Sequence, residues 1–402
     1  MTTNIDEFIK EGTNVIIGLN KWSEYKTLRS NKIVKSFAQR RLDPVGVMDF
    51  TVIITSKSCK KYISDINSEK VIEVKEEPTF KSIDNSLKEI YPIYKKVTDS
   101  GLLSTFTLIA LGGGSVIDTA KILSMMLSNN IKYSREAEQW HPRVSTKRAR
   151  RQIYLICVPS TAGTGAEATQ FSTIWDKENG LKYSIVSDKL NRTIILDPEI
   201  SLSLPGEITI STGIDALCQL LESTWSKKAD TSSIKSAKLG YQILKNNIVR
   251  TVDDPKNQDS RLSMLISSYL SGISISKANT TLCHSISYPL TALLGMPHGL
   301  ACGFTLIEVI KFNSSNENEL IKNTLLATEN SDSKELINEI EEIFELVHYK
   351  DLMSPFINQI ISSLDKILPL TITNSRASNN PRNANIDDIR FIVEKSIDRI
   401  TN

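Results

Sequence analysis

The chain has 402 residues, which is enough for two domains that each bury a core and more than one compact unit of usual size needs. Its 40% hydrophobic and 23% charged residues exclude a disordered, collagen-like or disulfide-scaffold protein. A formal net charge of +2 provides no global field that attracts nucleic acid or an anionic membrane, so we expect a small ligand as the partner.

The cysteines and the first residues indicate a cytoplasmic location. The 5 cysteines are scattered and form no C-x-x-C pair, which favours reduced thiols over a zinc knuckle or a disulfide framework. The N-terminus lacks the basic and apolar regions of a signal peptide, and no stretch approaches the roughly 18 apolar residues of a membrane span. We therefore expect a cytoplasmic protein without a membrane segment.

Short β-branched runs recur in the first half, with polar or helical-looking segments between them. They lie at residues 14–17, 51–55, 71–74, 106–111, 153–158 and 193–196. This alternation predicts βαβ units and a mostly parallel sheet. Residues 134–152 interrupt it with several basic side chains. We expect a solvated surface loop there, with contact to an anionic ligand or a neighbouring subunit as the alternative.

The second half has a different pattern. After residue 205, long amphipathic segments with few strand signals predict a helical domain. The expected fold class is therefore an α/β domain with a mostly parallel sheet over residues 1–204, followed by an all-α domain over residues 205–402. Residues 374–385 contain the run Ser-Asn-Asn-Pro-Arg, which predicts a polar loop before a final helix.

Two loops that follow predicted strands have the composition of a phosphate cradle. The first, with the start of the next helix, supplies Gly112, Gly113, Gly114, Ser115 and Asp118, and the second supplies Ser160, Thr161 and Thr164. Glycines let the backbone approach a pyrophosphate, and free amides at a helix N-terminus face its charge. Open α/β sheets bind ligands at the ends of adjacent strands. The first loop lacks the G-x-G-x-x-G pattern, so a tight structural turn is the alternative.

The helical half contains candidate metal ligands. Asp215 and Gln219 are four residues apart in a helical context, so they share one face, and His284 and His298 are two of only 4 histidines. One carboxylate, one amide oxygen and two imidazoles suit Fe²⁺ or Zn²⁺ and leave room for a substrate oxygen. A single histidine is more often a hydrogen-bonded structural residue than a metal ligand, so only the four residues together favour a metal site.

These motifs, in this order, resemble the iron-containing (group III) alcohol dehydrogenases. The matching segments are residues 112–121, 160–167, 197–198, 215–219, 284–299 and 379–381. The resemblance implies the dehydroquinate synthase-like fold, a homodimer, and a nicotinamide dinucleotide on the two loops. It also implies an active site between the two halves, with Asp215, His284 and His298 as metal ligands and Fe²⁺ expected ahead of Zn²⁺.

The sequence departs from that family at two positions. Gln219 stands where the family usually has a histidine ligand, and an amide oxygen is a poorer transition-metal ligand, which leaves the metal identity open. Tyr288 stands where the family usually has a second histidine, four residues after His284. We predict that Tyr288 donates a proton to the nascent alkoxide, with a packing role as the alternative.

Together with Gln219, three segments look like the phosphonoacetaldehyde reductases: residues 171–176, 275–281 and 287–291. If residues 277–284 are helical, one face carries a cation and hydroxyls beside His284, as an aldehyde bearing a phosphonate dianion needs. We therefore assign Lys277, Thr280, Thr281 and Phe171 to the substrate, with Lys277 also in the catalytic set. A surface or structural lysine is the alternative for Lys277.

The expected reaction is reduction of phosphonoacetaldehyde to 2-hydroxyethylphosphonate, in which the metal polarises the aldehyde oxygen and the reduced nicotinamide delivers hydride. In the iron-containing family that the chain resembles, an acidic residue after the second main strand often selects NAD by repelling the 2′-phosphate of NADP. Here the strand at 51–55 continues into Ser56 instead, so we expect NADPH as well as NADH, with Ser56 and Lys182 in the nucleotide site. The alternatives are a general short-chain alcohol dehydrogenase, a dehydroquinate-synthase-like cyclase, and a metal-poor nucleotide-binding pseudoenzyme suggested by Gln219.

Overall fold

The structure is a computed structural model that describes residues 5–9, 13–30, 49–99, 105–139, 153–177, 181–187, 192–315, 319–372 and 376–402. The chain divides into two compact units. Unit 1 comprises Met1–Ser160, Gln170–Asp176 and Lys182–Ser201, and unit 2 comprises Thr161–Thr169, Lys177–Leu181 and Leu202–Asn402. The chain passes from unit 1 to unit 2 for the last time after Ser201, near the predicted boundary at residues 204–205. Two earlier segments of the first half, Thr161–Thr169 and Lys177–Leu181, also belong to unit 2.

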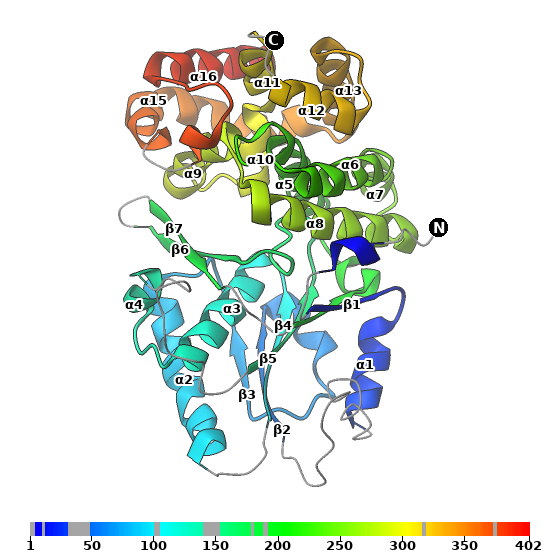
Figure 1. Ribbon diagram of the computed structural model, residues 1–402, viewed down its shortest axis with the longest axis vertical. Coiled ribbons are helices and arrows are strands. Elements are labelled where there is room, and N and C mark those ends of the chain that lie inside the picture. Colours follow the sequence, from blue (N-terminus) through cyan, green and yellow to red (C-terminus); the bar gives the residue numbers. More distant parts are fainter. Residues whose placement is uncertain are drawn as a thin grey trace. The chain divides into compact units, whose positions relative to one another are not determined.

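Unit 1 contains a six-stranded sheet with the order β1-β8-β5-β4-β2-β3, in which every pairing is parallel (Figure 1). Its strands are β1 (Thr13–Ile17), β2 (Asp49–Thr55), β3 (Lys70–Glu73), β4 (Thr105–Gly112), β5 (Ile153–Pro159) and β8 (Arg192–Leu196). The side chains of β8 are all buried, and those of β4 are buried after its first residue, as the apolar runs of a covered parallel sheet require. The predicted parallel sheet is confirmed, strand by strand.

Helices and a second, small sheet complete the α/β part of the fold. The helices are α1 (Lys21–Ser30), α2 (Phe80–Asp99), α3 (Gly114–Asn129) and α4 (Ser134–Gln139), with 3-10 turns η1 (Asp6–Phe8), η3 (Lys57–Tyr62) and η4 (Pro198–Ser201). The two-stranded sheet pairs β6 (Phe171–Asp176) with β7 (Leu181–Val186), and the sequence patterns did not predict it.

The prediction of a solvated loop at residues 134–152 is wrong for its first six residues, which form α4. The Ser134 amide donates to Asp84 at 2.7 Å, and the Arg135 guanidinium lies 3.7 Å from the ring centroid of Phe80 and pairs with Asp176 at 3.1 Å. These contacts supply the partners that a short helix needs to be stable. The other basic residues of the segment lie outside the described residues; they are Arg143, Lys147, Arg148, Arg150 and Arg151.

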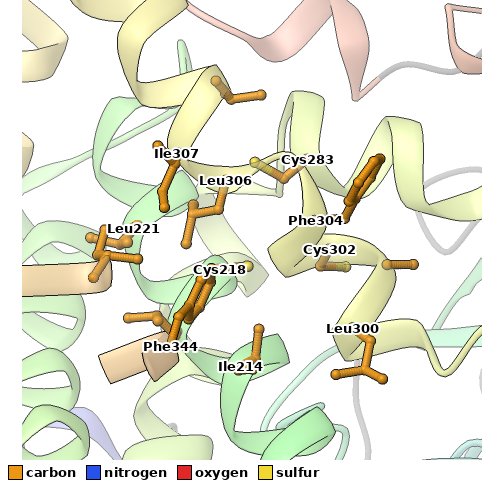
Figure 2. Close-up of a cluster of buried hydrophobic side chains, with 14 of the residues drawn as sticks. Ile214, Cys218, Leu221, Cys283, Leu300, Cys302, Phe304, Leu306, Ile307 and Phe344 are labelled. Atoms are coloured by element: carbon orange, nitrogen blue, oxygen red, sulfur yellow. The ribbon is translucent and has the colours of Figure 1, made fainter. Parts of the chain in front are cut away.

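Unit 2 is helical from α5 onward, as predicted. Its helices are α5 (Gly206–Trp225), α6 (Thr231–Lys245), α7 (Ile248–Asp253), α8 (Gln258–Ala278), α9 (Leu282–Leu294), α10 (His298–Phe304), α11 (Leu306–Ser314), α12 (Glu319–Thr328), α13 (Ser333–Leu346), α14 (Tyr349–Met353), α15 (Ile357–Thr371) and α16 (Ile386–Thr401), with 3-10 turns η5 (Ser354–Phe356) and η6 (Ala377–Asn379). Figure 2 shows how side chains of α5, α9, α10, α11 and α13 meet in its apolar core. Within the described ranges, no helix is long and apolar enough to cross a bilayer.

The segment predicted as a polar loop before the final helix is polar but buried at its centre. The Asn379 side-chain amide donates to Ser226 Oγ at 2.8 Å and to the Ala278 carbonyl at 3.0 Å, and Asn380 exchanges hydrogen bonds with Asn313. The asparagines therefore satisfy buried polar groups at the ends of neighbouring helices, instead of facing solvent. The final helix is confirmed as α16.

Candidate functional site

The glycine turn of unit 1 lies between the end of β4 and the start of α3. Gly113 is the N-cap of α3 and has no side chain to occupy the first amides of the helix. Because Gly112 pairs with Pro159 across the sheet, the two predicted loops begin side by side, and the Ser160 amide donates to the Gly112 carbonyl at 2.9 Å. An open helix N-terminus at the ends of adjacent strands is the arrangement that binds a pyrophosphate.

The carboxylate of Asp118 accepts hydrogen bonds from other residues of unit 1. It accepts hydrogen bonds from the Thr173 amide at 2.9 Å and from Lys121 Nζ at 3.3 Å, and so ties α3 to β6. Lys121 is completely buried, and burial lowers its pKa against the opposing effect of Asp118. Asp118 therefore stabilises a buried cation, and its role toward a nucleotide stays a prediction.

The other residues of unit 1 that were assigned to ligands occupy three separate elements. Ser56 follows β2, and its hydroxyl lies 3.1 Å from that of Ser58. Lys182 lies on β7 with its ammonium 5.3 Å from the ring centroid of Trp175, and Phe171 begins β6 and accepts a hydrogen bond from Lys121 through its carbonyl. These assignments stay predictions.

The loop 161–169 packs backbone to backbone on α8 in unit 2. Gly165 has φ +55°, and its amide donates to Ser268 Oγ at 3.2 Å. A Cβ at Gly272 would lie 2.3 Å from the Gly165 carbonyl oxygen, which leaves no room for a side chain. The glycine at position 165 thus allows the loop to pack closely on α8. Thr164 accepts from the Ala166 amide at 3.3 Å, and the nucleotide role of Thr161 and Thr164 stays a prediction.

Three of the four predicted metal ligands converge in unit 2. Asp215 on α5, His284 on α9 and His298 on α10 come together with Cys302, also on α10, and their candidate ligand atoms all lie within 4.8 Å of one another. His284 Nε2 is 3.2 Å from Asp215 Oδ1, and Cys302 Sγ is 3.8 Å from His298 Nε2. We call these four residues the metal cluster. Cys302 was not among the predicted ligands.

A buried carboxylate behind the metal cluster was also missed. Glu222 on α5 is fully buried, and its Oε1 accepts from the Thr281 amide at 3.1 Å and the Cys283 amide at 2.9 Å, at the N-terminus of α9. Thr281 is the N-cap of α9 but gives no side-chain cap, so Glu222 supplies it. Its Oε2 hydrogen-bonds His284 Nδ1. A carboxylate on Nδ1 leaves Nε2 free to bind a metal.

The electrostatics of the metal cluster favour a cation. Burial alone would lower the pKa of His284, but Cys302, Glu222 and Asp215 outweigh it and raise that pKa well above its usual value. A positive charge is thus stabilised at this point, whether a proton or a metal carries it. One carboxylate, two imidazoles and one thiol are a donor set that fits a divalent transition metal.

Gln219 lies one turn after Asp215 on α5, as predicted, and its side chain is buried. Its Oε1 accepts a hydrogen bond from Ser271 Oγ at 2.9 Å. An amide oxygen has two lone pairs, so this bond uses one of the two through which it could bind a metal. Ligation by Gln219 stays a prediction.

The prediction that residues 277–284 form one helical face is wrong. α8 ends at Ala278, Asn279 has φ 58° and ψ 170°, and α9 begins at Leu282, so the i, i+4 geometry does not apply across the break. Lys277 has a side chain 43% exposed and lies 3.9 Å from Asp230.

The two threonines in the break are buried. The Thr281 hydroxyl donates to Glu222 at 2.7 Å and accepts from Trp225 Nε1 at 2.8 Å, which makes it a structural link. Thr280 offers its carbonyl to Asn379 at 3.1 Å. The substrate role of Thr280 and Thr281 therefore stays a prediction without the helical argument behind it.

Tyr288 lies against the metal cluster. Its ring stacks on the His298 imidazole, with centroids 5.8 Å apart and an interplanar angle of 20°. On the Tyr288 ring lies a cation that the sequence reasoning missed, because the Arg376 guanidinium carbon is 5.1 Å from the ring centroid. The Tyr288 phenol ring thus adjoins the cluster, and Arg376 lies against that ring.

Comparisons with known proteins agree with this arrangement. The family sequence description "Iron-containing alcohol dehydrogenase" matches residues 44–198, and "Fe-containing alcohol dehydrogenase family, C-terminal" matches residues 209–397. A similar curated protein is the phosphonoacetaldehyde reductase of Streptomyces viridochromogenes, 36% identical over 51% of this chain and 52% of that protein. Another is the probable alcohol dehydrogenase EutG of Escherichia coli, 30% identical over 59% of each. The matched segments thus span only about half the length of these relatives.

Among solved structures, the sulfoacetaldehyde reductase of Bifidobacterium kashiwanohense in complex with NAD+ has a similar fold. Its TM-score is 0.77 at 22% identity, over 96% of this chain and 98% of that one. An iron-containing alcohol dehydrogenase from Thermococcus thioreducens gives a TM-score of 0.74 over similar lengths. The fold class predicted from the sequence is therefore confirmed.

Proposed function

Since the chain belongs to the iron-containing alcohol dehydrogenase family, we propose that it is a metal-dependent, NAD(P)H-linked reductase of a small aldehyde. The observation that carries the proposal is the metal cluster, in which three predicted ligands from three helices meet. When bound, the metal polarises the carbonyl oxygen and the dihydronicotinamide supplies a hydride. The chain's own contribution would be to hold the cation with Asp215, His284 and His298, and to orient the His284 imidazole through the hydrogen bond between its Nδ1 and Glu222.

Tyr288 is the proposed proton donor to the alkoxide product. Its stacking on His298 puts a phenol beside a proposed metal ligand, and Tyr288 is only 7% exposed. Placing a donor within reach of the reacting oxygen is the first requirement of general acid catalysis. Water is the alternative donor.

We expect Asp215→Ala and His298→Ala to lose reductase activity in parallel. Loss of a residue that only hydrogen-bonds to a metal ligand weakens metal binding by roughly 10–100-fold, and loss of the ligand itself costs more. We therefore expect kcat/KM to fall by at least about 100-fold. Activity is measured on purified protein reconstituted with Fe²⁺ or Zn²⁺, and metal content is measured on the same samples. Asp351→Ala is the control, because that side chain is 81% exposed and has only a 3.9 Å contact with His348. Full activity in both ligand variants rules the proposal out.

For the substrate we propose phosphonoacetaldehyde, reduced to 2-hydroxyethylphosphonate. Two similar proteins bear names of reductases that act on a two-carbon aldehyde with an anionic group, one a phosphonate and one a sulfonate. A cation suits such a substrate, and the candidate is Arg376, whose guanidinium lies on the ring of Tyr288, which in turn stacks on His298. A general short-chain alcohol dehydrogenase is the second candidate, and it needs no cation there.

A panel of phosphonoacetaldehyde and propanal, run with NADPH and with NADH, tests the substrate and the cofactor together. We expect Arg376→Gln to raise KM for the phosphonate by about 10–100-fold, the worth of one charge-assisted hydrogen-bonded contact, and to leave KM for propanal nearly unchanged. Lys277→Ala is the matched comparison. A larger selective effect in Lys277→Ala assigns the anion to Lys277, and no selective effect in either variant favours the general dehydrogenase.

A further inference from the structure

Cys302 lies where the apolar core of unit 2 meets the metal cluster. It is completely buried on α10, one helical turn after His298, and it belongs to the same apolar group as Leu300 and Phe304 (Figure 2). Its sulfur is 3.8 Å from Nε2 and 4.0 Å from Nδ1 of His298. A cysteine that only filled core space would have apolar neighbours, but this sulfur also faces imidazoles and a carboxylate.

The spacing of the metal cluster fits tetrahedral coordination. Metal bonds of about 2.0–2.3 Å require neighbouring ligand atoms to be roughly 3.3–3.8 Å apart. The pair His284 Nε2 and Asp215 Oδ1 lies at 3.2 Å, and the pair His298 Nε2 and Cys302 Sγ at 3.8 Å. All four candidate ligand atoms lie within 4.8 Å of one another, so shifts of about an ångström or less would bring them to tetrahedral spacing around one metal ion.

We infer that Cys302 is the fourth protein ligand of the metal, that Gln219 is not, and that the thiolate makes the site prefer Zn²⁺ over Fe²⁺. Thiolate is a softer donor than a carboxylate or an amide oxygen, and soft donors favour zinc. Binding replaces the S–H bond with a metal–sulfur bond and releases that proton to solvent. Gln219 keeps its hydrogen bond with Ser271. The inference deepens the proposed function and rests on the metal dependence in it.

Cobalt(II) added to the metal-free protein tests the inference without any substrate. We expect 1:1 binding with a sulfur-to-cobalt charge-transfer band in the near ultraviolet and the intense visible bands of a four-coordinate ion. Cys302→Ala should lose the charge-transfer band and weaken metal binding by at least about 100-fold, more than the loss of a supporting partner costs. Cys218→Ala is the matched control, because Cys218 is equally buried in the same apolar core and is not part of the metal cluster.

A competition experiment gives the second readout. After anaerobic incubation with equal amounts of Zn²⁺ and Fe²⁺, the wild-type protein should contain mostly zinc, and this excess should shrink in Cys302→Ala. A cobalt spectrum without the sulfur band in the wild-type protein overturns the inference by itself, even if Cys302→Ala does not fold. If the protein reduces the aldehyde but its cobalt form lacks the sulfur band, the proposed function is supported and the Cys302 assignment is wrong. If the band is present but no aldehyde is reduced, the Cys302 assignment is supported and the proposed function is wrong.

Discussion

Gly299→Ala is expected to lower the free energy of unfolding by about 3 kcal/mol and to empty the metal cluster, because overpacking a close contact between helices forces their backbones apart. A Cβ at Gly299 would lie 1.7 Å from the Ser211 carbonyl oxygen and 3.1 Å from Asp215 Cβ. Both of those residues are on α5, and Gly299 directly follows His298. The shift that relieves the clash therefore separates Asp215 from His298.

Urea unfolding and metal analysis of the purified variant measure the two effects. Gly206→Ala is the matched control, since Gly206 is the first residue of α5 and a Cβ there would meet nothing within 4 Å. That substitution should stabilise the protein by about 0.4–1 kcal/mol, because it reduces the freedom of the unfolded chain. Wild-type stability and metal content in Gly299→Ala contradict the prediction.

Glu222→Gln is expected to weaken metal binding by about 10–100-fold, as loss of a partner behind a ligand does, with a smaller effect on stability. The amide can still accept from the Thr281 and Cys283 N–H groups through its oxygen. Its NH₂ group, however, donates toward His284 Nδ1, which moves the imidazole proton to Nε2 and blocks the metal-binding nitrogen. Glu222→Ala should in addition unfold more readily, by roughly 3–5 kcal/mol, because buried partners lose their acceptor.

Metal titration of the metal-free protein, followed by urea unfolding, separates these two effects. Glu308→Gln is the control, because Glu308 is also largely buried in unit 2 but pairs at 2.8 Å with Lys311, a half-exposed side chain one turn away. Its substitution should cost no more than about 1 kcal/mol and leave metal binding intact. Equal metal affinity in Glu222→Gln and the wild-type protein would show that Glu222 only caps α9.

The parallel sheet could be predicted because its strands contain their own signal. Residues 106–111 form an almost continuous apolar run, and a strand that is buried on both faces shows such a run in the sequence. The small sheet of β6 and β7 has no such pattern. Its strands mix Lys, Ser, Thr and aromatic residues, and their pairing depends on contacts with residues far away in sequence, such as the 2.7 Å hydrogen bond from the Trp175 amide to the Pro78 carbonyl.

The metal cluster was predictable where a ligand has a rare side chain or a second polar residue beside it at helical spacing. Asp215 and Gln219 show the four-residue spacing of a helix, and histidines are few in this chain. Cys302 and Glu222 were missed for different reasons. Cys302 follows His298 by four residues, which is the spacing of one helical turn. Its apolar neighbours in the sequence, however, indicate a core residue rather than a ligand. Glu222 acts on α9, some sixty residues later, and only tertiary packing reveals that contact.

The helical face that was predicted from Lys277 to His284 failed for a local reason. Ala278 precedes Asn279, whose φ of 58° and ψ of 170° lie outside the helical range, so α8 ends there. Periodicity extends a helix through such a break unless the asparagine is read as a stop signal. Arg376 became the better candidate cation only once its distance to Tyr288 was known.

The contact between Gly165 and Gly272 also bears on how this sequence can be recombined with those of its relatives. The two glycines are more than one hundred positions apart, and each leaves the space that the other's backbone fills. A chimera joined near residue 201 would inherit the loop from one parent and α8 from the other. Such a hybrid keeps this contact only if the parent that supplies the loop has glycine at position 165 and the parent that supplies α8 has glycine at position 272. A junction near residue 201, which the domain layout favours, therefore separates two positions that depend on each other.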